Sequence, residues 1–271
     1  MDQGIALIGF GEAGSTFAGA AGWGAQAWAH DIRADRAAVA QALGLHFPGT
    51  AAAALAGADI LLSLVTADAA LTVARDYAPC LKPGALWCDM NSVAPDTKRA
   101  AAAIIEAHGA HYVDVAVLAP VEPARMAVPL LVAGPAADAA AAALGAAGFA
   151  NIRVVGSEVG RASAIKMIRS VMVKGIEALT AEMMLAATRA GVVDEVLSSL
   201  DASERAQDWS HRAAYNIERM ATHGLRRAAE MEESAKTLAA LGVEPVMTAG
   251  TVRRQREQAG HMIAKPTGAA A

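Results

Sequence analysis

The sequence is poor in several features that mark whole classes of protein. Of its 271 residues, only two are cysteines and 4% are aromatic. Two cysteines are too few for a disulfide framework, and Cys80 and Cys88 lack the spacing of zinc ligands, so we expect no metal site there. Their apolar neighbours indicate small buried side chains. With 23 basic and 27 acidic residues, the net charge of -4 gives no general attraction to nucleic acid.

Long uncharged apolar runs are also missing. A helix that spans a bilayer needs about 20 consecutive apolar residues, and no stretch of that length is free of charge, glycine or proline. The first residues, Met1-Asp2-Gln3-Gly4, lack the basic start of a signal peptide. Much of the 55% apolar content is alanine, which favours helices. We therefore expect a cytoplasmic protein of two modest domains, without a membrane or nucleic-acid partner.

The most informative stretch near the start is a glycine-rich turn. The apolar run at residues 5–8 predicts a buried strand, and helix formers occupy residues 15–21. Between them, G-x-G-x-x-G is typical of dinucleotide binding: its first glycine permits the tight turn, its second admits a pyrophosphate, and its third lets the helix pack closely. The helix N-terminus then faces the phosphates. We expect cofactor binding by Gly9, Phe10, Gly11, Glu12, Ala13 and Gly14.

The choice of cofactor depends on Asp31, which follows a second strand predicted over residues 25–30. An acidic residue at this point accepts hydrogen bonds from the adenosine ribose and repels a 2′-phosphate. Arg33 and Arg36 follow closely and could neutralise such a phosphate. Asp31 could instead cap the next helix. The sequence therefore favours NAD(H), with Asp31 and Arg33 at the cofactor, and leaves NADP(H) open.

Strand-like runs continue at residues 59–65, 85–90, 111–117, 128–132 and 151–155, separated by mostly helical segments. This order predicts an α/β fold with a Rossmann-type, mostly parallel sheet covered on both faces. Asn91 and Ser92 follow one of these strands at the edge where ligands bind, and they either contact the nicotinamide ribose or cap the next helix. Beyond a long helix starting near Gly160, the chain reads as almost wholly helical. We expect a dinucleotide-binding domain at 1–158 and a smaller all-α domain at 159–271.

Four segments, at residues 9–14, 89–95, 114–120 and 160–170, resemble in this order the β-hydroxyacid dehydrogenase superfamily. This superfamily contains 3-hydroxyisobutyrate and 6-phosphogluconate dehydrogenases. Within it, the chain is most similar to bacterial phosphogluconate-dehydrogenase-like proteins with a C-terminal helical domain of their own. The resemblance implies a Rossmann domain, a long linking helix, and a helical domain that pairs two subunits into a homodimer.

The resemblance also implies specific residues at the active site. A lysine on the linking helix acts as general acid/base in the family, and it maps onto Lys166. Crowding by Ile165, Met167 and Ile168 could lower the pKa of this amine, so that it accepts a hydroxyl proton. The alternative is an ordinary solvated lysine. The nicotinamide side of the cleft is expected to be lined by Val65, Thr66 and Asn91.

Three positions depart from the family pattern. Leu118-Ala119-Pro120 stands where the family has Ser-Gly-Gly, which holds a substrate carboxylate; leucine has no hydroxyl and proline has no N–H. Ser170 replaces an asparagine, and Val173 replaces the glutamate acid of decarboxylating enzymes. A small hydroxy acid bound in the usual way, and oxidative decarboxylation, are therefore not expected. The expected substrate contacts are Leu118, Ala119, Pro120, Ser170 and Lys174.

The helical half contains two polar clusters. Charges alternate along residues 225–233, which favours an exposed, ion-paired helix face. Alternatively, His223, Arg226 or Arg227 binds an anionic substrate. The second cluster, which lines either a pocket or a core, consists of Trp209, His211, Tyr215 and Asn216.

The sequence as a whole predicts an NAD(P)-dependent dehydrogenase or reductase that acts on a CH–OH group of a small molecule. The nicotinamide carries the hydride, and Lys166 exchanges the proton with an alcohol or ketone oxygen. Two alternatives remain. One is an imine reductase, which an apolar wall at residues 118–120 would suit. The other is a non-catalytic dinucleotide sensor.

Overall fold

The computed structural model describes residues 4–203 and 209–261. The chain divides into two compact units, residues 1–170 and residues 171–271. The boundary therefore falls after Ser170, whereas the sequence placed it after Glu158. The difference arises because the first turns of the long helix belong to the cofactor-binding unit, and Lys166 belongs to it with them.

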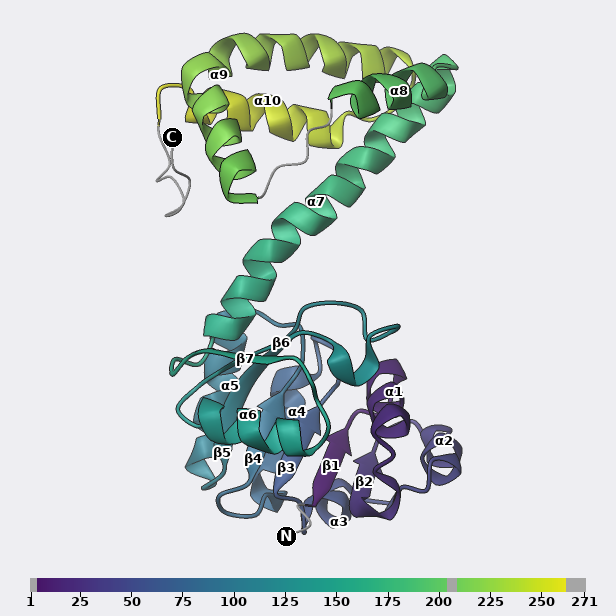
Figure 1. Ribbon diagram of the computed structural model, residues 1–271, viewed down its shortest axis with the longest axis vertical. Helices are drawn as coiled ribbons and strands as arrows, with labels where there is room; N and C mark the ends of the chain where they lie inside the picture. Colours follow the sequence, from purple (N-terminus) through teal and green to yellow (C-terminus); the bar gives the residue numbers. More distant parts are fainter. Residues whose placement is uncertain (1–3, 204–208, 262–271) are drawn as a thin grey trace. The chain divides into compact units, whose positions relative to one another are not determined.

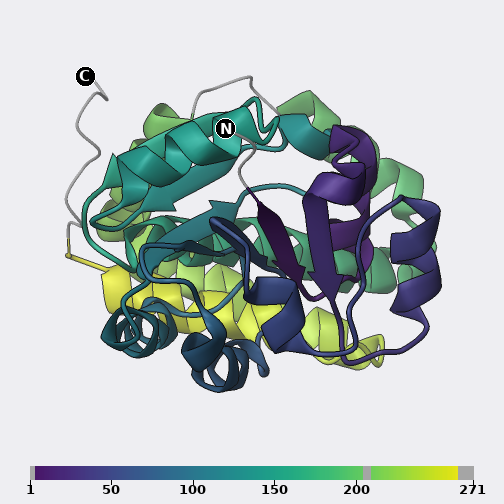
Figure 2. The ribbon, with the colours of Figure 1, turned by 90° about the horizontal axis from the view of Figure 1, so that it is seen from below.

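The first unit is built on a seven-stranded sheet in the order β2-β1-β3-β4-β5-β6-β7. Strands β1 to β5 pair in parallel, β6 runs antiparallel to β5, and β7 is parallel to β6. The expected mostly parallel sheet is confirmed. The strands are β1 (Ile5–Ile8), β2 (Ala27–His30), β3 (Ile60–Ser63), β4 (Leu86–Asp89), β5 (His111–Val117), β6 (Leu130–Ala133) and β7 (Ile152–Gly156). Strands β1 and β2 are the darkest purple arrows in Figures 1 and 2.

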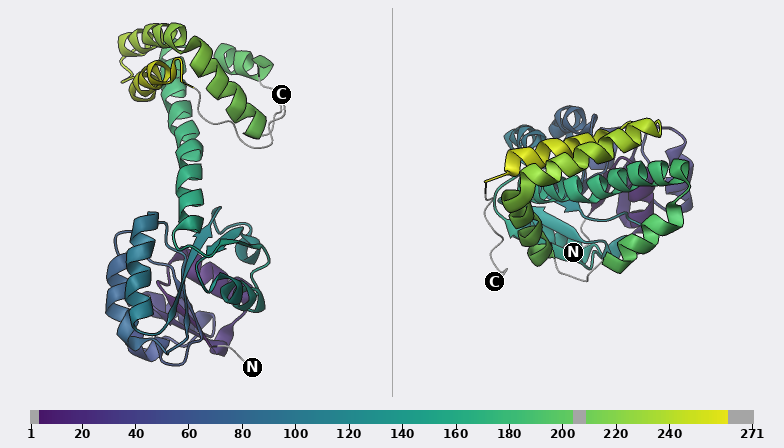
Figure 3. Two further views of the ribbon diagram at one scale, coloured as in Figure 1. Left: turned by 90° about the vertical axis from the view of Figure 1, so that its left-hand side faces the viewer. Right: turned by 90° about the horizontal axis from the view of Figure 1, so that it is seen from above.

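Helices cover both faces of the sheet, as Figure 3 (left) shows for the first unit. One face packs against α1 (Glu12–Ala21), α2 (Arg36–Ala42) and α6 (Ala137–Ala146), with Phe17 buried at its centre. The other face packs against α3 (Ala51–Leu55), α4 (Ala70–Tyr77) and α5 (Pro95–Ala107), around Trp87 and Tyr112. Most helix residues that meet the sheet are alanines, so the helices approach it closely.

Short 3-10 turns complete this unit: η1 (Gly24–Gln26), η2 (Ala78–Cys80) and η3 (Arg125–Ala127). The turn η1 explains why β2 begins at Ala27, two residues later than the sequence suggested. Cys88 is fully buried in β4, as expected, and burial raises the pKa of its thiol to about 12. Cys80, at the end of η2, is only partly buried.

The second unit is helical, as the sequence predicted. It contains the later turns of α7 (Arg161–Ala190), followed by α8 (Val193–Ser203), α9 (Trp209–Ala240) and α10 (Val246–Gln258). Glu182 on α7 is buried, and its carboxylate accepts hydrogen bonds from the N–H groups of Met247 and Thr248 and from the Thr248 hydroxyl. The first N–H groups of a helix have no partner within it, so Glu182 satisfies the start of α10. Within the described ranges, no helix is long and apolar enough to cross a membrane.

Candidate active site

The glycine-rich turn joins β1 to α1, and its glycines meet different constraints. Gly9 has a φ of +86°, and a Cβ there would lie 2.5 Å from the Leu64 carbonyl oxygen. A Cβ at Gly14 would lie 2.8 Å from the Gly9 carbonyl oxygen. The fold itself therefore requires glycine at both positions. At Gly11, in contrast, a Cβ would meet no atom within 4 Å. Gly11 keeps open the space in front of the N-terminus of α1, where an anion is favoured.

A cavity of about 250 Å³ opens beside this turn, and we name it the Asp31 cavity. One Asp31 oxygen accepts a hydrogen bond from the Phe10 N–H at 2.7 Å, and the other accepts from the Arg33 N–H at 2.9 Å. Asp31 therefore holds the glycine-rich turn and does not cap α2, whose N-cap is Asp35. The lining residues are Ile8, Gly9, Gly11, His30, Asp31, Ile32, Arg33, Arg36, Leu64, Val65, Thr66, Ala69, Val73 and Tyr77.

Four further residues of the Asp31 cavity bear on the expected cofactor site. Val65 and Thr66, which the resemblance assigned to the nicotinamide side, line this cavity beside Asp31. His30 and Tyr77 were missed; their rings meet edge to face with centroids 5.8 Å apart. Burial lowers the pKa of His30, so its ring is neutral at pH 7. These two rings give the cavity a surface suited to a flat heteroaromatic group.

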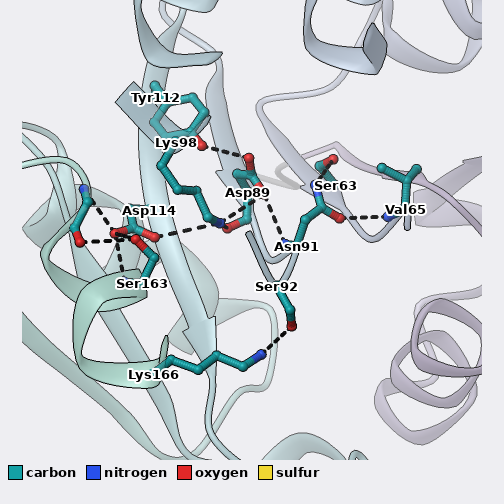
Figure 4. Close-up of polar contacts among 11 residues, drawn as sticks. Ser63, Val65, Asp89, Asn91, Ser92, Lys98, Tyr112, Asp114, Ser163 and Lys166 are labelled. Atoms are coloured by element: carbon teal, nitrogen blue, oxygen red, sulfur yellow. Dashed lines mark hydrogen bonds and ion pairs between the residues drawn. The ribbon is translucent and has the colours of Figure 1, made fainter. Parts of the chain in front are cut away.

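A second cavity, of about 380 Å³, contains Lys166, and we name it the Lys166 cavity. The Lys166 amine donates a hydrogen bond to the Ser92 hydroxyl oxygen, with 2.5 Å between nitrogen and oxygen (Figure 4). Among the described residues that line it, Lys166 and Glu12 are the charged ones. The lining residues are Glu12, Ala13, Phe17, Leu64, Met90, Ser92, Val117, Ala119, Pro120, Val121 and Lys166.

The two cavities lie on either side of the same turn. Gly9 and Gly11 line the Asp31 cavity, Glu12 and Ala13 line the Lys166 cavity, and Leu64 lines both. The Phe10 side chain lies elsewhere, fully buried in the core. The structure therefore brings the glycine-rich turn, Asp31 and Lys166 into one continuous region of the first unit.

The wall expected from residues 118–120 is only partly in the Lys166 cavity. Ala119 and Pro120 line it, whereas Leu118 packs under the start of α7, in a cluster with Ala162 and Ile165. Ser170 is half-buried and does not line the cavity. The side chain of Lys174 lies outside the described residues. The observed wall is therefore apolar but shorter than the sequence suggested.

Behind the Lys166 cavity lies a fully buried ionic network that the sequence did not reveal (Figure 4). The Lys98 amine donates to the Asp89 carbonyl oxygen at 2.6 Å and to an Asp89 carboxylate oxygen at 2.9 Å, and lies 3.6 Å from Asp114. The Tyr112 hydroxyl donates to the other Asp89 oxygen at 2.6 Å. Burial and the Asp89 charge raise the pKa of Tyr112, so it remains a donor. We name Asp89, Lys98, Tyr112 and Asp114 the buried network.

The buried network holds the start of α7. One Asp114 oxygen accepts hydrogen bonds from the N–H groups of Gly160 and Ser163 and from the Ser163 hydroxyl. Gly160 has a φ of +100°, a backbone conformation that residues with a Cβ rarely adopt. Glycine is therefore required at the turn into α7. From the level of Asp114 the helix runs towards Ser92, past the end of β4, and so brings Lys166 to the ligand edge of the sheet.

Asn91 is buried and serves the protein itself. Its side-chain oxygen accepts from the Val65 N–H at 2.7 Å, and its amide group donates to the Ser63 hydroxyl at 2.9 Å. Its own N–H donates to Asp89 at 2.9 Å. The N-cap of α5 is Ala94, so Asn91 does not cap that helix. Asn91 therefore ties the ends of β3 and β4 together.

The chain resembles known proteins over almost its full length. Residues 4–156 match the family model described as the NAD binding domain of 6-phosphogluconate dehydrogenase, and residues 187–258 match a domain of unknown function, DUF1932. A conserved hypothetical protein from Sinorhizobium meliloti is 40% identical, with a TM-score of 0.64, over 94% of this chain and 88% of that one. A conserved protein of unknown function, whose structure is described as similar to 3-hydroxyacid dehydrogenases, is 29% identical, with a TM-score of 0.62, over 94% and 96%. An imine reductase from Streptomyces aurantiacus shares the fold, with 19% identity and a TM-score of 0.76 over 94% of each chain.

Proposed function

Because the chain belongs to the family of the 6-phosphogluconate dehydrogenase NAD-binding domain, within the β-hydroxyacid dehydrogenase-like proteins, we propose that it is an NAD(P)-dependent oxidoreductase. It transfers hydride between the nicotinamide and the carbon of a small alcohol or ketone. The observation that carries this proposal is the position of Lys166. Its amine lines a cavity that shares the glycine-rich turn with the Asp31 cavity.

The residues present fit a dinucleotide. The open space at Gly11 and the N-terminus of α1 would hold the pyrophosphate, and Asp31 would hold the adenosine ribose. The neutral His30 ring and Tyr77 suit the adenine. When bound, the cofactor supplies or accepts the hydride.

The protein's own contribution is the proton. In reduction, the Lys166 ammonium donates a proton to the carbonyl oxygen of the substrate, and in oxidation the neutral amine takes the proton back from the hydroxyl. The Ser92 oxygen, which accepts a hydrogen bond from Lys166, fixes the direction of the amine. Ala119 and Pro120 exclude water from the apolar side of the substrate.

The charges around Asp31 favour NAD(H) over NADP(H). Arg33 and Arg36 both lie next to Asp35, at 2.8 Å and 3.4 Å from its carboxylate. The two cations are therefore shared with a neighbouring anion, while Asp31 itself faces the cavity. A 2′-phosphate would meet two carboxylates as well as two guanidinium groups.

Imine reduction is the second candidate function. The Lys166 cavity has an apolar wall at Ala119 and Pro120 and a single carboxylate, Glu12, that could accompany a protonated imine. The presence of Lys166 counts against this candidate, since a protonated imine needs no further proton donor.

We expect Gly11→Ala to leave the fold intact but to weaken cofactor binding about 10- to 100-fold, because the added methyl group fills the space reserved for the pyrophosphate. Titration of protein fluorescence with NADH measures the affinity, and thermal unfolding checks the fold. Gly57→Ala is the matched control, since its Cβ also meets no atom within 4 Å but lies away from both cavities. Equal affinities of the Gly11 and Gly57 variants for NADH would show that the glycine-rich turn does not bind the cofactor.

The proposed function is tested by turnover. Oxidation of NADH and NADPH is followed with neutral ketones, keto acids and cyclic imines, and reduction of NAD⁺ with the corresponding alcohols. We expect turnover with neutral ketones and their alcohols, and a preference for NADH. Faster turnover of cyclic imines would favour the imine reductase. A rise in melting temperature with NADH, but no turnover of any substrate, would favour the non-catalytic sensor.

A further inference from the structure

The helical unit contains a cavity of its own, of about 520 Å³, bordered by α7, α9 and α10. Its polar lining consists of Tyr215, Asn216, Arg219, Arg227 and Gln255. Tyr215 and Asn216 come from one polar cluster of the sequence and Arg227 from the other, so the fold brings the two clusters together. We name this space, lined by these five polar residues, the arginine cavity.

Three polar atoms of the arginine cavity are buried without a hydrogen-bond partner. Among the described residues, no hydrogen-bond partner lies within reach of Arg219 Nε, Arg227 Nε or Gln255 Oε1, and all three atoms are buried. Gln255 is 8% exposed. None of the described residues that line the cavity is acidic. Arg219 stacks over the Tyr215 ring at 5.7 Å, which orients the guanidinium but does not neutralise it.

Two exposed arginines on α10, in contrast, have acidic partners. Arg253 and Arg254 both pair with Glu257, at 2.7 Å and 2.9 Å, although their side chains are mostly in solvent. Buried polar atoms in proteins are nearly always hydrogen-bonded, and buried charges are nearly always paired. Arg219 and Arg227 are half-buried as whole residues, but the buried Nε donor of each has no partner among the described residues. Two such donors in one cavity point to a partner that comes from outside the chain.

The chemistry of the three unmatched atoms specifies that partner. Two guanidinium groups match the geometry of an oxyanion, either carboxylate or phosphate. Gln255 Oε1 is an acceptor and needs a hydrogen-bond donor, which an oxyanion alone does not supply. An ammonium would be repelled by the two arginines, so the donor is a neutral group, of which a hydroxyl is the simplest. The volume is in the range of small-molecule sites.

We propose that the arginine cavity binds a small molecule that carries both an oxyanion and a hydroxyl group. Arg219 and Arg227 hold the oxyanion, and Gln255 accepts a hydrogen bond from the hydroxyl. The arginine cavity shares no lining residue with the Lys166 cavity, and its proposed role does not depend on the proposed hydride transfer.

The test is isothermal titration calorimetry of the full chain without cofactor. Lactate and glycerol 3-phosphate represent the carboxylate and phosphate forms of the ligand; acetate lacks the hydroxyl, and glycerol lacks the charge. We expect one-to-one binding of lactate or glycerol 3-phosphate, binding of acetate at least tenfold weaker than that of lactate, and no binding of glycerol. The stronger of the first two identifies the oxyanion. Absence of heat with both would overturn the proposal.

Variants locate the binding site. Arg227→Gln is expected to weaken binding of the better ligand at least tenfold, and Gln255→Leu to reduce the preference for lactate over acetate. Arg254→Gln, which removes an exposed arginine of α10, is the matched control and should bind normally. If Arg227→Gln does not fold, Arg219→Lys, which keeps the positive charge, takes its place in this test. Unchanged affinity in the folded cavity variants, or an equal loss in Arg254→Gln, would refute the site.

Discussion

Replacement of Lys166 by methionine is expected to lower kcat by about 10²- to 10⁴-fold on the best substrate, the usual contribution of a general acid/base. Methionine keeps most of the length of the side chain but has no amine that could donate or accept a proton. Cofactor affinity should change little, because Lys166 does not line the Asp31 cavity. Steady-state turnover at 340 nm and fluorescence titration with NADH measure the two quantities separately.

Two further variants make this result specific. Ser92→Ala removes the hydroxyl that accepts a hydrogen bond from Lys166, so we expect a smaller loss of kcat and a changed pH profile. Lys82→Met is the control, because Lys82 is half-exposed and pairs with Asp59, away from both cavities. Wild-type turnover by a folded Lys166→Met protein would show that the proton moves by another route.

Lys98→Met is expected to destabilise the first unit by about 3–5 kcal/mol, the usual cost of breaking a buried ion pair from one side. The variant leaves the carboxylates of Asp89 and Asp114 buried without their cation. Chemical denaturation measures the loss. The exposed Lys82–Asp59 pair provides the comparison, since its removal should cost no more than about 1 kcal/mol. A similar, small cost for both variants would contradict a role of the buried network in stability.

Lys98→Met should also lower catalysis, because it disturbs the position of α7 and hence of Lys166. Asp114 holds the first N–H groups of α7, and Lys166 follows within the next turns. Asp114→Asn keeps the size of the side chain and is the milder substitution if Lys98→Met does not fold. In either variant, provided that it folds, we expect kcat to fall while the affinity for NADH stays near that of the wild type. An equal fall in both would indicate general loosening of the unit.

Much of the first unit could be predicted from the sequence because its signals are local. The apolar runs located the strands within a few residues, and Gly9, Gly11 and Gly14 located the turn. The reversal of β6 could not be predicted, because a short run such as Leu130–Ala133 reads the same in a parallel or an antiparallel strand.

The parts of the site that escaped prediction depend on contacts between distant residues. Lys98 lies on α5 between Thr97 and Arg99, and polar neighbours of this kind usually indicate a surface lysine. Its burial makes sense only because Asp89 and Asp114 stand opposite each other on neighbouring strands. Asn91 follows a strand, as ligand-binding residues do, but its partners Ser63 and Val65 come from another strand end. The arginine cavity likewise joins residues of α9 and α10.

The burial of Cys88 provides a means of observing the Asp31 cavity directly. Because burial raises the pKa of this thiol to about 12, we expect it to stay protonated at neutral pH and not to react with maleimides. The other cysteine of the chain, Cys80, is partly exposed and follows Tyr77 closely in sequence. A fluorophore coupled to the unmodified protein should therefore attach at Cys80 alone. Tyr77 lines the Asp31 cavity. The emission of the fluorophore on Cys80 would therefore report the binding of a nucleotide without any change to the sequence.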